Sequence, residues 1–222
     1  MNARAALLVL ADGRFPAGGH AHSGGVEAAV AAGRVRDAAG LAAFCQGRLH
    51  TAGLTSAALA AAAALGEEDP LDLDEAADAR TPSPALRAVA RRLGRQLTRA
   101  ARAVWPSAEL DALAAARPRG AHQPVVLGLT ARAAGLGPGD AAHCAVYESV
   151  SSPATAAVRL LGLDPFEATA VLAALAPELD ETAARATAAA RGGIPALPAA
   201  SAPLLDITAE QHAAWPVRLF AS

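Results

Sequence analysis

Two histidines near the N-terminus form the pattern in this chain that comes nearest to a metal site. His20 and His22 lie two residues apart in the loop Gly18–Ser23. In an extended segment, such a pair can present both imidazoles to one ion. A closed site needs further ligands, and neither a cysteine nor a third histidine is nearby in the sequence. The pair therefore leaves two interpretations open, which are metal binding and a structural or interface role.

The other residues that could do chemistry do not form a recognisable catalytic set. Glu27 follows the two histidines, but a carboxylate in the first turn of a helix is favoured there by the helix dipole alone. Ser23 precedes two glycines without the pattern of a nucleophile elbow, and no HExxH or CxxC motif occurs. We therefore expect no catalytic residue, no cofactor-binding residue and no tight metal ligand. The remaining histidines are expected to be hydrogen-bonded or on the surface: His50, His122, His143 and His212.

The composition excludes further classes of function. All nineteen basic residues are arginine, so the chain has neither the lysine of a P-loop nor the lysine of a Schiff-base enzyme. A net charge of −2 argues against a nucleic-acid surface. The apolar run Ala5–Ala11 is too short to span a membrane, and no signal-peptide order is found, so we expect a cytoplasmic protein. Cys45 and Cys144 are expected to be buried free thiols.

The elements that must position these residues are helices. Apolar residues recur every three or four positions, and no stretch alternates as a strand would. We predict an all-α fold, with a compact single domain of about ten helices and an extended C-terminal tail. Residues 1–191 form its helical part, and residues 192–222 add a Pro/Gly linker, a short helix over Thr208–Ala214 and the tail.

Local signals predict several helix ends. Asp37, Ser83 and Asp164 are expected to cap helices, the last two with proline at the first helical position. Ser23 is expected to cap a helix that ends at Gly33. We also predict two separate helices at Ala141–Ser151 and Ala154–Leu161.

One predicted helix, Ser83–Val104, is rich in arginine. Leu86, Val89, Leu93 and Leu97 form its apolar stripe. The other faces carry Arg87, Arg91, Arg92, Arg95, Arg99 and Arg102. A solvated helix face is the simpler interpretation of these charges, and a surface for an acidic partner is the alternative.

A series of motifs extends along nearly the whole chain. The first is the segment Leu7–Glu27, which contains His-Ala-His-Ser-Gly-Gly-Val-Glu. The others are Gly33-x-Val35-x-Asp37, Arg91–Leu97, His122–Gly128, Tyr147 before Ala156–Leu160, and Arg218–Ser222. In this order they resemble the motifs of the UreF family of urease accessory proteins. The commoner form of the first motif in that family is Phe-x-x-Ser-x-Gly-Leu-Glu, and the departure here resembles an actinobacterial branch. After Arg159, many members continue Pro-Leu-Gly-Gln, which this chain lacks.

The resemblance implies a helical scaffold that is often dimeric and is not an enzyme. It implies partners UreD (also called UreH), the GTPase UreG and apo-urease, with no membrane or nucleic acid involved. Nickel would be handled by the complex and not held tightly as a cofactor. The alternative is a nickel carrier that binds metal through His20 and His22. The positions expected to bind partners are His20, His22, Ser23, Glu27, His122, Tyr147, Arg159, Arg218, Leu219 and Phe220.

The end of the chain is unusually apolar. Trp215, Val217, Leu219 and Phe220 need covering, either by a partner or by the chain's own domain. We favour docking on UreD, with Arg218 pairing with a carboxylate there. On that interpretation, removal of Trp215–Ser222 leaves the fold and the melting temperature nearly unchanged.

Overall fold

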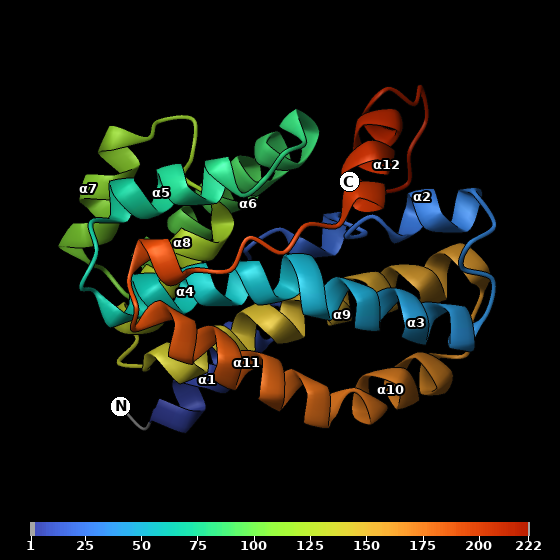
Figure 1. Cartoon of the computed structure of the whole chain (residues 1–222), viewed down its shortest axis with the longest axis horizontal. Helices are drawn as coiled ribbons and strands as arrows, with labels where there is room; N and C mark the ends of the chain where they lie inside the picture. Colours follow the sequence, from blue (N-terminus) through green and yellow to red (C-terminus); the bar gives the residue numbers. More distant parts are fainter. Residues whose placement is uncertain (1–2, 222) are drawn as a thin grey trace.

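The computed structural model describes residues 3–221, and within that range the chain is helical and contains no strand (Figure 1). The all-α prediction is confirmed. The α-helices are α1 Ala3–Ala11, α2 Val26–Ala31, α3 Ala38–Arg48, α4 Leu54–Leu65, α5 Pro70–Ala79, α6 Pro84–Val104, α7 Ala108–Ala116, α8 Gln123–Ala133, α9 Pro138–Leu161, α10 Pro165–Ala174, α11 Ala176–Ala190 and α12 Pro203–Ala213. Shorter helical turns are η1 Gly19–Ala21, η2 Leu49–Gly53 and η3 Ile194–Ala196.

Helix α4 lies at the centre of the molecule and packs against α8, α9 and α11 (Figure 1). Its residues 57–64 are all buried, and seven of these eight are alanine. Small side chains allow the neighbouring backbones to come close. At Gly128 of α8, an added Cβ would lie 2.2 Å from the carbonyl oxygen of Ala60. The alanine-rich composition therefore yields a core built on close helix contacts rather than on large rings.

Three predicted helix starts are confirmed by their hydrogen bonds. The Asp37 carboxylate accepts from Gly40 N at 2.7 Å, and Ser83 Oγ accepts from Leu86 N at 3.1 Å. The Asp164 carboxylate accepts from Phe166 N at 2.8 Å. Each cap satisfies a backbone N–H that has no partner within its own helix. These ends are therefore set by local chemistry.

The predicted start of the second helix is wrong. Helix α2 begins at Val26 and not after Ser23, and its preceding residue Gly25 has a φ of +90°. Gly24 also has a positive φ, so the chain turns through two left-handed residues that favour glycine. Ser23 Oγ accepts a long bond of 3.4 Å from Glu27 N. The two glycines, and not the serine, set this helix start.

The predicted division between Ser151 and Ala154 is also wrong, because α9 continues through Pro153 as one helix. Proline at 153 has no N–H to donate to the carbonyl of Ser149. That carbonyl instead accepts from Arg48 Nε of α3 at 2.9 Å. A residue distant in sequence thus supplies the hydrogen bond that the helix lacks at this carbonyl, and this reduces the free-energy cost of a proline inside the helix.

The segment between α11 and α12 is held against the domain. Arg80, at the end of α5, donates to the carbonyl oxygens of Ile194, Leu197 and Pro198 at 2.9–3.2 Å. Helix α12 starts at Pro203 and is longer than the predicted Thr208–Ala214, because proline at the first helical position favours a start there.

Both cysteines are buried free thiols, as predicted, and burial raises the pKa of Cys45 to about 11 and that of Cys144 to about 12. Among the described helices, none is both long enough and apolar enough to cross a bilayer.

Candidate partner-binding site

The carboxylate of Glu27 joins the two ends of the chain. Glu27 lies in the first turn of α2, and both it and His212 of α12 are buried. His212 Nε2 is 2.8 Å from Glu27 Oε2, and this nitrogen must carry the proton because an ionised carboxylate only accepts. The backbone N–H groups of Leu219 and Phe220 donate to the same carboxylate at 2.8 and 3.1 Å. The helix dipole alone does not account for Glu27, since its side chain organises the C-terminal tail.

The last described residues are anchored by Phe220. Its side chain is 4% exposed, and the guanidinium carbon of Arg159 lies 5.0 Å from the ring centroid. Ala221 N donates to the carbonyl oxygen of Ala21 at 2.8 Å, which ties the tail to the N-terminal loop. These contacts argue against the prediction that the tail can be removed without effect on the fold. Ser222 lies outside the described residues.

Other tail residues remain uncovered. Val217 is 82% exposed and Leu219 is 66% exposed, although Phe220 beside them is buried. Arg218 is exposed and borders a pocket of about 250 Å³ between α12, α6 and the N-terminal loop. The tail thus holds two apolar side chains and one arginine in water on a backbone that Glu27 fixes in place.

The N-terminal loop separates two pockets. His22 borders both the pocket near Arg218 and a second one of about 330 Å³, which is also lined by His20, Tyr147, Arg159 and Phe220. Burial lowers the pKa of His22 to about 4, and the positive charges of Arg92 and His20 act in the same direction. His22 is therefore neutral at pH 7, whereas His20 is exposed. Among the described residues, no group of three or more His, Cys, Asp or Glu side chains is placed to hold a metal ion.

A polar cluster on the wall between the pockets was missed by the sequence analysis. Glu148 of α9 accepts from Gln123 Nε2 at 2.7 Å. Burial raises the pKa of Glu148, although Gln123 and the nearby Arg48 act against that change. The helical periodicity of the sequence could have identified Glu148. It lies three residues after Ala145 and seven after Ala141, and both alanines are buried, so all three share one face of the helix. A charged residue at the helical spacing of buried apolar residues indicates a polar group that faces the interior of the fold.

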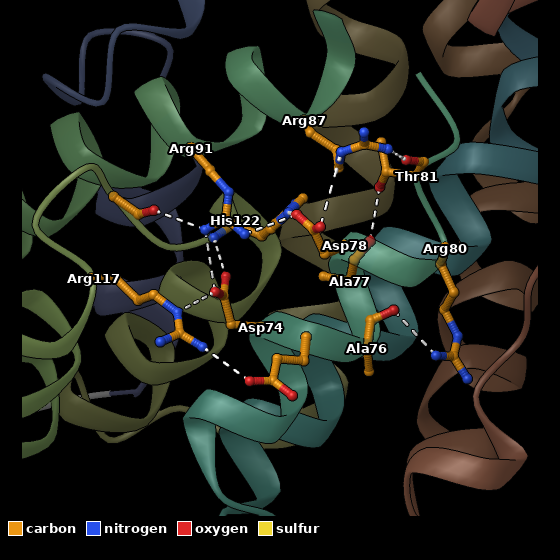
Figure 2. Close-up of polar contacts among 12 residues, drawn as sticks. Asp74, Ala76, Ala77, Asp78, Arg80, Thr81, Arg87, Arg91, Arg117 and His122 are labelled. Atoms are coloured by element: carbon orange, nitrogen blue, oxygen red, sulfur yellow. Dashed lines mark hydrogen bonds and ion pairs between the residues drawn. The ribbon is translucent and has the colours of Figure 1, made fainter. Parts of the chain in front are cut away.

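His122 belongs to a different part of the molecule. Its backbone N–H donates to Asp74 at 2.7 Å, and its Nε2 lies 2.9 Å from Asp78 Oδ1 (Figure 2). Asp74 is fully buried and also accepts from Arg91 at 3.2 Å and from Arg117 at 2.8 Å. Burial lowers the pKa of His122, and the Asp78 bond only partly offsets this. His122 therefore joins α5, α6 and α8 and does not line the two pockets at the N-terminal loop.

The structure thus places most of the predicted partner-binding residues in two groups and two residues outside them. One group gathers around the pockets: His20, His22, Tyr147, Arg159 and Arg218. A second is buried beneath them and holds both ends of the chain: Ser23, Glu27 and Phe220. Leu219 projects into solvent from the same tail, and His122 is separate. Residues far apart in sequence are therefore assembled into one surface, formed by the N-terminal loop, part of α9 and the C-terminal tail, which we call the end-to-end surface.

Comparison with known proteins finds similarity along the entire chain. A family model described as UreF matches residues 35–176. The chain is 46% identical to a protein of Mycolicibacterium vanbaalenii named "Urease accessory protein UreF", with all of both chains aligned. It is 45% identical to the protein of that name from Mycobacterium marinum over the full length of each. Against the Mycobacterium tuberculosis protein of the same name the identity is 44%, over 96% of this chain and 95% of that one. The two full-length alignments include the N-terminal loop and the tail, which lie outside the family-model match.

Proposed function

This chain belongs to the UreF family of urease accessory proteins, and we propose that it acts as a scaffold in the assembly that loads nickel into apo-urease. The relatives are named as accessory proteins and not as enzymes, and this chain is likewise an accessory protein and not a catalyst. The proposal concerns the partner proteins of this chain and the surface on which they dock.

The end-to-end surface is the observation that best supports a scaffold role. Val217 and Leu219 stand in water while Phe220 and Glu27 hold their backbone in position. Two large apolar side chains on an ordered backbone suit a protein interface, because little ordering entropy remains to be lost on binding. We assign UreD (UreH) to this surface, with Arg218 available for a carboxylate of the partner.

The rest of the proposal follows the family. UreG supplies GTP hydrolysis, since this chain has no lysine for a phosphate loop. The complex, and not a tight site in this chain, handles nickel on its way into apo-urease. We further propose that the chain works in the cytoplasm as a homodimer, without nucleic acid or membrane partners.

A pull-down with two charge variants tests the assignment. Val217→Asp with Leu219→Asp places two carboxylates on the exposed part of the tail and leaves Phe220 in the core. We expect UreD capture and urease activation to fall at least about tenfold while the melting temperature stays within a few degrees of wild type. Phe166→Asp is the matched control, because Phe166 is 83% exposed on α10, away from the tail. Normal UreD capture by the double variant would reject this surface as the docking site.

The alternative function is a nickel carrier that uses His20 and His22. The exposed His20 and the neutral His22 border one pocket, which is the observation in its favour. Two imidazoles leave the other coordination positions to water, so we expect weak binding. Calorimetry with NiCl₂ on wild type and on the double variant His20→Ala with His22→Ala separates the two functions. A sub-micromolar affinity that disappears in the double variant would favour the carrier.

A further inference from the structure

The charge of this chain is strongly divided along its sequence. Residues 84–120 contain eight arginines against Glu109 and Asp111, which leaves this segment with a net charge of +6. Since the whole chain carries −2, the remaining residues together carry −8. A nearly neutral protein thus has one concentrated basic region, formed by α6 and the turn that follows α7.

Five of these arginines surround one open crevice of about 830 Å³. Arg87, Arg91 and Arg95 lie four residues apart on α6, so they form a row that rises about 6 Å from one to the next. Arg117 and Arg119 face them from the turn between α7 and α8. Alanine, proline and glycine make up most of the remaining lining, which leaves room between the two basic walls: Ala88, Ala116, Pro118 and Gly120.

Internal contacts hold some of the arginines in position without neutralising all of them. Figure 2 shows Arg91 and Arg117 converging on the buried Asp74 and Arg87 directed toward Asp78. Asp78 is the acidic group that borders the crevice itself, and bonds from His122 and Arg91 hold it ionised against the effect of burial.

Arg95 and Arg119 are different. Within residues 3–221 neither has an acidic partner, and Arg95 Nη1 donates only to the carbonyl oxygen of Arg119 at 3.2 Å. Both side chains belong to exposed residues. The crevice therefore combines guanidinium groups held by internal carboxylates with exposed ones that have no acidic partner among residues 3–221.

We propose that this crevice binds an acidic helical segment of a partner protein, one that presents carboxylates at positions i, i+4 and i+8. Such a helix repeats its side chains at the same 6 Å rise as the arginine row, so its carboxylates follow the positive charges of Arg87, Arg91 and Arg95. Direct pairs form with Arg95 and with Arg119 across the crevice, because Arg87 and Arg91 are already held by Asp74 and Asp78. Arginine suits this role because its planar fork pairs with a carboxylate through two parallel hydrogen bonds. The inference goes beyond the proposed function, because it concerns a second surface and does not depend on the identity of the UreD docking site.

A nucleic acid is the less favoured ligand for this crevice. Its lining contains no aromatic side chain on which a base could stack. The overall negative charge of the chain also opposes the approach of a long polyanion, whereas a short acidic helix contacts only the basic region.

The test uses a fluorescein-labelled helical peptide of about 20 residues with glutamates at i, i+4, i+8 and i+12, together with the isomeric peptide in which they are scattered around the helix. Fluorescence anisotropy with the full-length protein at 50 mM NaCl should show that the first peptide binds and that the second binds several-fold more weakly. Both peptides should bind more weakly at 300 mM NaCl, because salt screens the charges. We expect Arg95→Glu with Arg119→Glu to reduce affinity for the first peptide at least tenfold. The matched control is Arg34→Glu with Arg185→Glu, which makes the same change of net charge at two exposed arginines outside the crevice and should bind like wild type.

Three results would overturn the proposal. The first is no binding of the aligned peptide by wild type up to 1 mM. The second is an equal loss of affinity in both double variants, which would indicate a general charge effect. The third is tighter binding of a 12-base-pair DNA duplex than of the peptide, abolished by Arg95→Glu with Arg119→Glu, which would assign the crevice to nucleic acid.

Discussion

Glu27 and His212 lie 185 residues apart in the sequence, and their side chains form a buried pair with 2.8 Å between Oε2 and Nε2. The same carboxylate accepts two backbone N–H groups of the tail. One side chain of the N-terminal segment thus satisfies three donors at the other end of the chain. A single buried acid therefore ties α2 to α12 and to the C-terminal tail.

Replacement of Glu27 should therefore be costly. Glu27→Ala leaves the buried His212 Nε2 and Phe220 N–H, and the half-buried N–H of Leu219, without their acceptor, so we expect a loss of about 3–5 kcal/mol in the free energy of unfolding. Urea denaturation followed by circular dichroism measures this loss. Glu181→Ala, at an exposed position of α11, is the control and should change the value by less than about 0.5 kcal/mol. An equally small effect at Glu27 would contradict the role of this carboxylate.

Phe220 should stabilise the fold. Phe220→Ala removes a buried ring that packs under Arg159, and we expect a loss of about 3 kcal/mol. Val217→Ala, at a side chain that is mostly in water, should be nearly neutral. Thermal unfolding of the two variants and of the chain truncated after Ala214 checks this. If the truncated protein melts at the wild-type temperature, the tail is not part of the core.

Asp74 should be more important for stability than its neighbours on α5. Asp74→Ala leaves Arg91, Arg117 and the backbone N–H of His122 without their shared buried acceptor. We expect a loss of at least about 3 kcal/mol. Asp72→Ala, at an exposed position of the same helix, serves as the control. Urea midpoints for the two variants that lie close together would show that the network in Figure 2 contributes little.

His22 should make stability depend on pH. Its pKa is about 4 in the folded chain, against an ordinary value of 6.5, so between these values the unfolded chain binds the proton and the folded chain does not. Stability is therefore lost as the pH falls through this window, by about 2 kcal/mol between pH 7.5 and pH 5.0 on account of His22. Urea unfolding at both pH values should show a dependence smaller by that amount in His22→Gln. The surface variant His143→Gln should retain the wild-type dependence, and identical slopes in all three proteins would refute the prediction.

The sequence by itself determined the class of fold and the ends of several helices. Helical periodicity is a property of neighbouring residues, and the caps Asp37, Ser83 and Asp164 act within their own first turns. The absence of lysine excluded whole classes of chemistry without reference to the fold. The ordered series of motifs indicated the family, which the comparisons confirm.

Only the tertiary structure decided which residues act together. No local rule pairs Glu27 with His212 or Arg48 with the carbonyl of Ser149, because each contact depends on how distant helices pack. The same reason explains the continuity of α9 through Pro153, where a long-range donor replaces the bond that the local rule counts as lost. It also explains why Phe220 is buried while Leu219 is exposed: both residues lie in a bend of the tail, and only the position of the domain beneath them determines which side chain is covered.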